Sequence, residues 1–552
     1  MKRYRYSVKP YRPPVRRSVR RALIVSVAGS VVLGAAYVLV PLGRGDASPP
    51  ALGPAGRARV AVAAGRPAAP ADLAALIGDR EAHLRAHPRD EHSWAVLGAA
   101  YVARGARTAD VAYYPKAERA LRTSLRARPE GNAEALTGLA ALANARRDFR
   151  AARVWGERAV RQAPKRWTGH AALIDAYTGL GDAKGVGKAL ESVKKLGSRS
   201  VVKTRAGQVY RDRGWREDAN AALTDAVALA ETRAERAACL HRVGELAWER
   251  GEPALALRHY DAALDSDPDH HASLAGRGRV LAALGRTSEA LHAYRSALTR
   301  QPLPEYALEL GELYEALKLR PAARAQYDVL RARVREESAG GVNNERVLGL
   351  FEADHGDPEV AVERLEAEYK RHPSPENADA LGWALHRSGE GEKGLKLVTK
   401  AIAKGPRSAL FAYHRGEIER QLGRYGAARR HIGEALRINP YFSPLAVPEA
   451  RHALEALGEP PEGGPEQVYE PAPAARGPER PRRTEPRASA PRSSQRQPAQ
   501  PRRARRGRRD ALAAGRDPLA RHPHRHARLD MRAEPGVLQP VRRHLHASPS
   551  ST

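Results

Sequence analysis

The chain has 552 residues, 42% of them hydrophobic, which is enough for several domains or for one long repeat array. Its formal net charge of +31 is concentrated at the two ends, because residues 1–45 carry +10 and residues 471–552 carry +14. The part between them is close to charge-balanced, so we expect no nucleic acid as a partner of the folded part.

An uncharged apolar segment is the first predicted element. Residues 22–42 read ALIVSVAGSVVLGAAYVLVPL, and at ~1.5 Å per residue a helix of this length spans ~30 Å, the thickness of the hydrocarbon core of a bilayer. We therefore expect a transmembrane helix that holds the chain to a membrane. A cleaved signal peptide and a buried soluble helix are the alternatives, although the apolar stretch of a signal peptide usually has only about 7–15 residues.

The flanking charges predict the orientation of this helix. Nine Lys and Arg residues lie within residues 1–21, whereas only Arg44 follows the apolar segment closely, so the basic tail of residues 1–21 should stay in the cytoplasm. The rest of the chain would then lie outside the cytoplasm on a single-pass anchor, or be secreted if the segment is cleaved. Residues 43–71 are rich in Ala, Gly and Pro, which predicts a flexible linker.

A pattern with a period of 34 residues follows, as the spacing of Gly244 and Gly278 illustrates. In the unit of residues 271–302, apolar residues recur at spacings of three and four on both sides of a turn at residues 284–287. This spacing predicts two helices that face each other, and Pro302 cannot continue the second one.

The repeated units resemble the tetratricopeptide repeat family. In the first unit Trp94, Leu97, Gly98 and Tyr101 have the W-x2-L-G-x2-Y spacing of that family. The resemblance implies an all-α fold, a right-handed solenoid of stacked helical pairs. One such pair cannot bury both of its faces alone, so its neighbours must cover it.

We place the solenoid at residues 72–458, with about ten repeats between residues 91 and 440. The segments at residues 72–86 and 448–457 are predicted to be capping helices at its two ends. From residue 459 to residue 552 the sequence is rich in Arg and Pro and poor in apolar residues, which predicts disorder. This tail could be a solvated tether, a segment that binds an anionic polymer, or the product of a misread coding frame.

We expect no enzyme activity and assign no catalytic residue or cofactor, because the chain has no phosphate-binding loop, nucleophile elbow, H-E-x-x-H or dinucleotide-binding loop. Cys239 is the single cysteine, which excludes an intrachain disulfide, and we interpret it as a buried, inert thiol. His270 and His271 are interpreted as a solvated turn between repeats. The His-rich residues 522–526 include Pro523 and Arg525, which oppose metal binding, so no metal site is assigned.

The resemblance also implies a concave groove that binds a protein or peptide. The family's groove positions fall here on Arg205, Arg211, His241, Arg242, Trp248, Arg279, Trp383, Tyr413 and Arg420. Four of these arginines lie on adjacent repeats and could form a basic stripe for acidic peptide groups, the alternative being an ordinary mixed, solvated surface.

The sequence thus predicts a membrane-anchored, non-catalytic scaffold that binds a protein or peptide. The alternatives are a regulatory or assembly subunit of an envelope enzyme complex, and a protein whose Arg-rich tail binds an anionic polymer.

Overall fold

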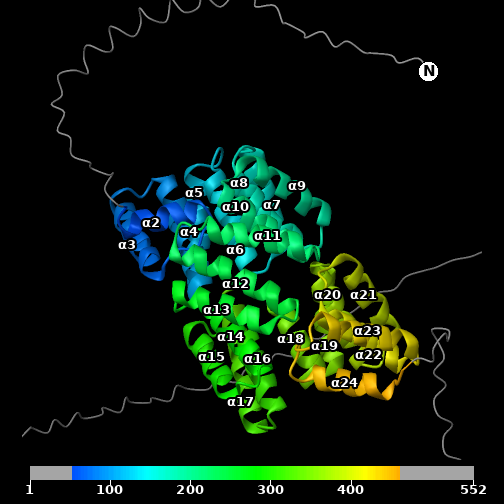
Figure 1. Cartoon of the computed structure of the whole chain (residues 1–552). Helices are drawn as coiled ribbons and strands as arrows, with labels where there is room; N and C mark the ends of the chain where they lie inside the picture. The colour runs from blue at the N-terminus through cyan, green and yellow to red at the C-terminus, as the bar shows by residue number, and fades with distance from the viewer. Residues whose placement is uncertain (1–51, 460–552) are drawn as a thin grey trace, which may run out of the picture. The chain divides into compact units, whose positions relative to one another are not determined.

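The computed structural model describes residues 52–459, and this part of the chain is helical with no strand. Figure 1 shows the helices following one another along the chain from α2 to α24. Three predicted segments lie wholly or almost wholly outside the described residues: the basic tail of residues 1–21, the apolar segment of residues 22–42 and the Arg-rich tail of residues 459–552. Within residues 52–459, no helix combines the length and the apolar character needed to cross a membrane.

Two helices precede the repeats, and five helical pairs follow them. The leading helices are α2 (Pro54–Ala63) and α3 (Pro70–Ala86). The five pairs are α4 (Glu91–Thr108) with α5 (Tyr113–Ala127), α6 (Ala133–Ala145) with α7 (Phe149–Gln162), α8 (Trp167–Gly179) with α9 (Ala183–Leu196), α10 (Arg199–Asp212) with α11 (Arg216–Ala228), and α12 (Arg233–Glu249) with α13 (Pro253–Ser266).

Five more pairs and a final helix complete the described part. The pairs are α14 (His271–Ala283) with α15 (Thr287–Arg300), α16 (Pro304–Ala316) with α17 (Arg320–Ala339), α18 (Glu345–His355) with α19 (Pro358–Arg371), α20 (Pro375–Arg387) with α21 (Gly391–Lys404), and α22 (Ala409–Gln421) with α23 (Tyr425–Ile438). The final helix is α24 (Ala446–Ala456). The described part thus contains ten helical pairs, within a helical-repeat solenoid.

The turn between α14 and α15 shows how a pair is closed. Gly285 has a φ of +75°, a left-handed conformation that glycine adopts without steric cost. The N–H of Arg286 then donates to the carbonyl oxygen of Leu281 at 2.9 Å, which satisfies a carbonyl at the end of α14. The short turn leaves α14 and α15 side by side and antiparallel, as the sequence spacing predicts.

Small residues allow the helices of one pair and of the next to pack closely around a large side chain. The ring of Tyr260 is fully buried, and it lies against Gly244 on α12 and Gly276 on α14. A Cβ atom at Gly276 would lie 2.6 Å from Cζ of Tyr260, closer than real Cβ contacts. The glycines are therefore part of the close packing between repeats.

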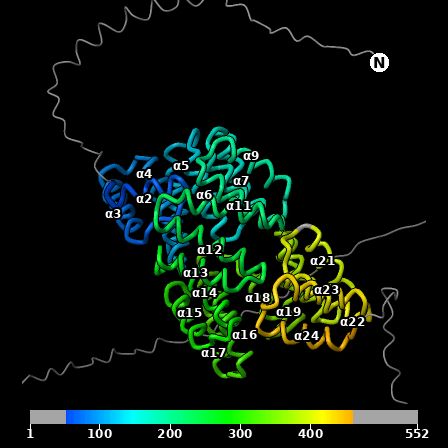
Figure 2. Tube along the Cα trace, viewed as in Figure 1, coloured from blue at the N-terminus to red at the C-terminus, as the bar shows by residue number. Residues whose placement is uncertain are grey.

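The path of the chain, which can be followed by colour in Figure 2, brings segments that are far apart in sequence into contact. Nε2 of Gln301 donates to the carbonyl oxygen of Ala106 at 3.1 Å across 195 residues. Nε of Arg150 donates to the carbonyl oxygen of Arg371 at 2.9 Å across 221 residues. Successive turns of the solenoid therefore touch each other, in addition to the contacts between neighbouring repeats.

One sequence-based expectation is corrected within the described residues. The linker predicted for residues 43–71 contains helix α2, and α3 already begins at Pro70. Pro54 fits the first turn of α2, because proline has no N–H and an N–H at this position would have no partner within the helix. Ala58 and Ala61 of the same helix are buried. Alanine-rich sequence forms a helix here because small apolar side chains suffice to pack it against α3 and α4.

Candidate functional site

A cavity of about 780 Å³ lies along the inner face of the first five repeats. Its walls come from the first helices of these pairs, α4, α6, α8, α10 and α12, and from the segment that joins α2 to α3. The lining residues recur at spacings of three and four along each helix, so one face of every first helix is turned to the cavity. On α4 this face carries Ala95, Val96, Ala99, Val102, Ala103 and Ala106.

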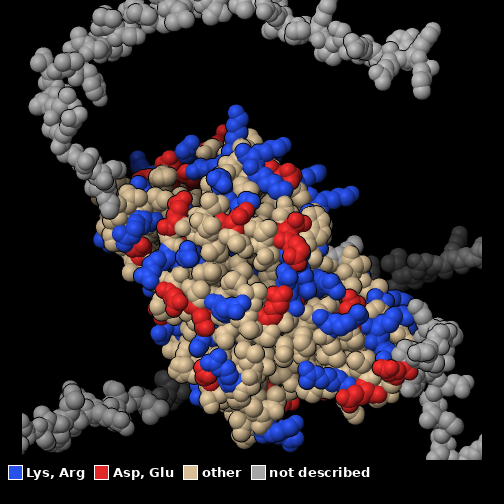
Figure 3. All heavy atoms as spheres, viewed as in Figure 1, with Lys and Arg blue, Asp and Glu red and all other residues tan. Residues whose placement is uncertain are grey.

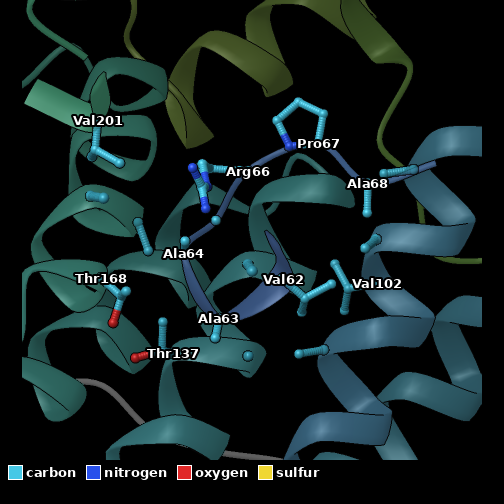
Figure 4. A pocket seen from close by; sticks show the side chains of 18 of the residues that line it. Val62, Ala63, Ala64, Arg66, Pro67, Ala68, Val102, Thr137, Thr168 and Val201 are labelled. Atoms are coloured by element: carbon cyan, nitrogen blue, oxygen red, sulfur yellow. The ribbon is translucent and has the colours of Figure 1, made fainter. Parts of the chain in front are cut away.

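The segment between α2 and α3 belongs to this site. Helix α2 ends at Ala63, Gly65 has a φ of +53°, and the N–H of Arg66 donates to the carbonyl oxygen of Ala61 at 2.8 Å. Residues 66–69 are not helical. Figure 4 shows the segment running between Val102 on one side and Thr168 and Val201 on the other. A non-helical stretch of the chain itself therefore lies on the inner face of the repeats.

The side chain of Arg66 is held by two carboxylates. It forms ion pairs with Glu231 and, at 3.5 Å, with Glu235. Glu235 is buried, and its carboxylate also accepts hydrogen bonds from the Ser200 hydroxyl and from the backbone N–H of Glu231. Because Glu235 is fixed by these contacts, it holds a negative charge in place beside Arg66.

The other arginines around the cavity fall into three groups. Three of them pair with carboxylates: Arg107 with Asp267, Arg166 with Glu134 at 2.6 Å, and Arg205 with Asp175 at 2.7 Å. Arg59 is exposed on α2. Arg242, on α12, forms no ion pair or hydrogen bond with another described residue, and its Nη1 atom is buried.

The surroundings of Arg242 disfavour its charge. Burial and the nearby charge of Arg205 lower the pKa of Arg242. The carboxylate of Asp175 forms its ion pair with Arg205, and it offsets these two effects at Arg242 only in part. The inner face therefore carries one enclosed positive charge without a partner among the described residues.

The structure places the predicted groove residues in several environments. Arg205 and Arg242 line the 780 Å³ cavity, whereas Arg211 and Trp248 line a second cavity of about 340 Å³ near Arg407. His241 is enclosed, and burial lowers its pKa to about 4.

Three of the four arginines of the predicted basic stripe are neutralised by neighbouring repeats. Arg205 pairs with Asp175, Arg211 pairs with Glu249, and Arg279 pairs with Glu245 at 3.3 Å and with Glu309 at 3.0 Å. The guanidinium of Arg279 also lies 5.9 Å from the ring centre of Trp248. Only Arg242 keeps a charge that is free for a ligand.

The predicted residues of the later repeats are engaged in packing. Trp383 is buried and donates from Nε1 to Oδ1 of Asp354 at 2.9 Å. Tyr413 is buried and donates from its hydroxyl to Glu449 at 3.1 Å. Arg420 pairs with Glu417 at 2.7 Å on its own helix. Trp383 and Tyr413 therefore join different helices of the described part, whereas the ion pair of Arg420 stays within α22.

The interpretation of His270 and His271 as a solvated turn is wrong. His270 is 7% exposed and caps α14, because its Nδ1 atom accepts from the N–H of Ser273 at 3.3 Å. His271 is also enclosed, and its Nδ1 atom forms a hydrogen bond of 2.8 Å with the hydroxyl of Tyr306. Cys239 is a buried free thiol, as expected, and burial raises its pKa.

Sequence reasoning did not identify two parts of the site: the α2–α3 segment, and the apolar residues that the first helices turn to the cavity. The Ala/Gly/Pro composition of residues 43–71 gave no sign that this segment lies on the inner face. The acidic partners of the arginines could have been found from the sequence, because an arginine and its partner can lie one repeat length apart. Glu245 and Arg279 are an example, at a separation of 34 residues. Residues 52–459 contain no group of three or more His, Cys, Asp or Glu side chains placed to hold a metal ion.

The sequence model of the tetratricopeptide repeat family matches residues 243–303, 275–337 and 380–441. The chain therefore carries tetratricopeptide repeats. No curated protein matches the chain in sequence.

Several solved structures have a similar arrangement of helices. A monomeric mutant of IFIT1 with Gppp-AAAA is 15% identical, covers 60% of this chain and 77% of its own, and has a TM-score of 0.39. Yeast Tom70 is 12% identical over 65% of this chain and 96% of its own, with a TM-score of 0.29. A tetratricopeptide repeat protein from Parabacteroides merdae is 18% identical over 47% of this chain and 99% of its own, with a TM-score of 0.29.

Proposed function

We propose that this protein is a membrane-anchored, non-catalytic scaffold that binds a polypeptide segment of a partner on the inner face of its first five repeats. The observation that carries the proposal is the α2–α3 segment, a stretch of this chain that already lies on that face. Arg66 supplies a charge-assisted contact to Glu231 and Glu235, and small apolar residues flank it. A partner segment of similar chemistry, apolar with one basic residue, would fit the same contacts.

The covalent connection of the segment makes it a strong competitor. A tethered segment has an effective local concentration on the order of mM, so a free peptide of the same sequence should bind the unmodified protein weakly. Loosening the segment should therefore open the site to a peptide added in solution.

The test uses the full chain with Arg66→Glu and a labelled peptide of residues 60–70 (VAVAAGRPAAP). The new carboxylate would face Glu231 and Glu235 and repel them, which should release the segment. We expect fluorescence anisotropy to show tighter peptide binding to this variant than to the unmodified chain. A peptide with Glu in place of its arginine should not bind.

Arg85→Glu is the matched control, because it makes the same charge change at an exposed position of α3. It should leave peptide binding as weak as in the unmodified chain. If the Arg66→Glu protein is folded by circular dichroism and the peptide still does not bind, the inner face is not a polypeptide site.

The membrane anchor is the second part of the proposal. It is supported by the uncharged segment of residues 22–42 and by the nine basic residues before it. Protease added to intact cells should degrade the repeats while the N-terminal tail stays protected. Protection of the repeats would contradict the proposed orientation, and release of a soluble chain that lacks residues 1–42 would favour secretion.

A further inference from the structure

The space between the α2–α3 segment and the first helices is large enough for a small molecule. Its volume of about 780 Å³ lies within the range of about 300–1,000 Å³ that is typical of ligand pockets. The segment of residues 62–68 forms one wall, so a small ligand could occupy this space while the segment stays in place.

Most of the wall is apolar and offers no hydrogen bonds. Ala95, Val102, Ala171, Ala172 and Val201 are buried residues that line the cavity from three different helices. Alkyl chains gain free energy when they move from water to such a surface. The wall therefore favours a ligand with an extended apolar part.

Arg242 adds a single charged contact to these walls. It has no hydrogen bond or ion pair with another described residue, and its Nη1 atom is buried. Arg66, Arg107, Arg166 and Arg205 already have carboxylate partners, and Arg59 is exposed to solvent. Among the described arginines that line the cavity, Arg242 is therefore the enclosed one without a partner. A buried charge without a partner is costly, and an anion that binds there would remove this cost.

His270 and His271 also line the cavity, but they are neutral above pH ~4, because burial holds the pKa of each at about 3. One guanidinium matches one planar carboxylate through two parallel hydrogen bonds. A doubly charged phosphate would keep an uncompensated charge in this apolar space. The charge of the site therefore fits a monoanion.

We propose that this cavity binds an aliphatic monocarboxylate, with the carboxylate on Arg242 and the alkyl chain against the alanine and valine rows of the first helices. This ligand is distinct from the polypeptide segment proposed above and occupies the space that the α2–α3 segment leaves free.

Titration calorimetry of the full chain with decanoate, below the concentration at which it forms micelles, tests the proposal. Decanoate should bind, whereas decanol, with the same chain and no charge, and acetate, with the charge and no chain, should bind far more weakly. Arg242→Gln should weaken decanoate binding by about 10- to 100-fold, the range expected for the loss of a charge-assisted hydrogen bond. Arg59→Gln changes an exposed arginine at the same cavity and should have no effect.

A second variant tests the apolar part of the site without changing its charge. Ala238→Phe fills the cavity from α12, so it should abolish decanoate binding while circular dichroism shows an unchanged helical fold. The basic tails are identical in all these proteins, so equal binding by the unmodified chain and by Arg242→Gln would mean that the tails bind decanoate, and the proposal would be overturned. Equal affinity for decanol, or undiminished binding by Ala238→Phe, would also overturn it.

Discussion

The side chain of Asn439, after α23, donates from Nδ2 to the carbonyl oxygen of Trp248 at 2.9 Å, although 191 residues separate them. This carbonyl belongs to the last turn of α12, where helices leave acceptors that need partners from outside. Asn439 is buried, and its Oδ1 atom also accepts from the N–H of Tyr441 at 2.9 Å. One asparagine thus joins the end of α12, the first helix of the fifth pair, to the end of the tenth pair.

Asn439→Ala should lower the free energy of unfolding by about 1–3 kcal/mol, because two hydrogen bonds are lost and a buried acceptor loses one partner. Thermal unfolding followed by circular dichroism gives the change. Arg437→Ala, at an exposed position of α23, is the control and should change stability by less than about 0.5 kcal/mol. Equal stability of the two variants would show that the contact between turns contributes nothing.

The repeats were predictable from the sequence because they depend on contacts between neighbours in the chain. The unit of residues 271–302 illustrates this, since α14 and α15 occupy the two predicted helices and the turn falls at Gly285. The contact of Asn439 with Trp248 was not predictable, because a periodic pattern does not record which turns of a solenoid meet. The contacts of Arg66 with Glu231 and Glu235 were not predictable either, because they also join segments that are far apart in the chain.

The charges of the candidate site could be predicted only in part. The sequence places Arg205, Arg242 and Arg279 on first helices, and the structure agrees. Their charge state depends on acidic residues about one repeat away, such as Asp175 for Arg205 and Glu245 for Arg279. Figure 3 shows the same intermixing of basic and acidic side chains over the visible face of the described part.

Arg279→Glu should therefore destabilise the fold rather than only weaken binding. Although burial favours the protonated form of Glu245, the charges of Arg279 and His241 hold its pKa at about 2, so the carboxylate is ionised. The substitution would bring three carboxylates together, at a cost of about 3–5 kcal/mol. Thermal unfolding measures this loss.

Arg286→Glu is the control for this charge reversal. Arg286 pairs with Glu289 at 2.7 Å on the exposed side of α15, and water and salt screen such exposed pairs, so they contribute little to stability. If Arg279→Glu lowers the free energy of unfolding no more than Arg286→Glu does, then the ion pairs of Arg279 with Glu245 and Glu309 do not stabilise the fold.

Gly276→Ala should lower the free energy of unfolding by about 1–3 kcal/mol, since its methyl group would collide with the buried ring of Tyr260. Gly78→Ala, inside α3, is the matched control, because no atom lies within 4 Å of the added Cβ. It should stabilise the protein by about 0.5–1 kcal/mol, since alanine favours a helix over glycine. If Gly276→Ala lowers the thermal midpoint and Gly78→Ala raises it, relative to the unmodified chain, the role of close packing is confirmed.

His270 should make the protein less stable in mild acid. Burial, aided by the nearby His241 and Arg107, lowers the pKa of His270 to about 3, against an ordinary value of 6.5. Between these values the unfolded chain takes up a proton that the folded chain excludes. The contribution of the neutral His270 to the free energy of unfolding is therefore complete above pH 6.5. As the pH is lowered below this value, the contribution decreases by up to about 1.4 kcal/mol per pH unit.

His270→Asn removes this titration and keeps an acceptor for the N–H of Ser273. The loss of thermal stability between pH 7.5 and pH 5 should be smaller in this variant than in the unmodified chain. His270→Ala should reduce the pH dependence equally but also cost about 1 kcal/mol at pH 7.5, because α14 loses its cap. An unchanged pH dependence in both variants would show that His270 takes up its proton equally in the folded and unfolded chains.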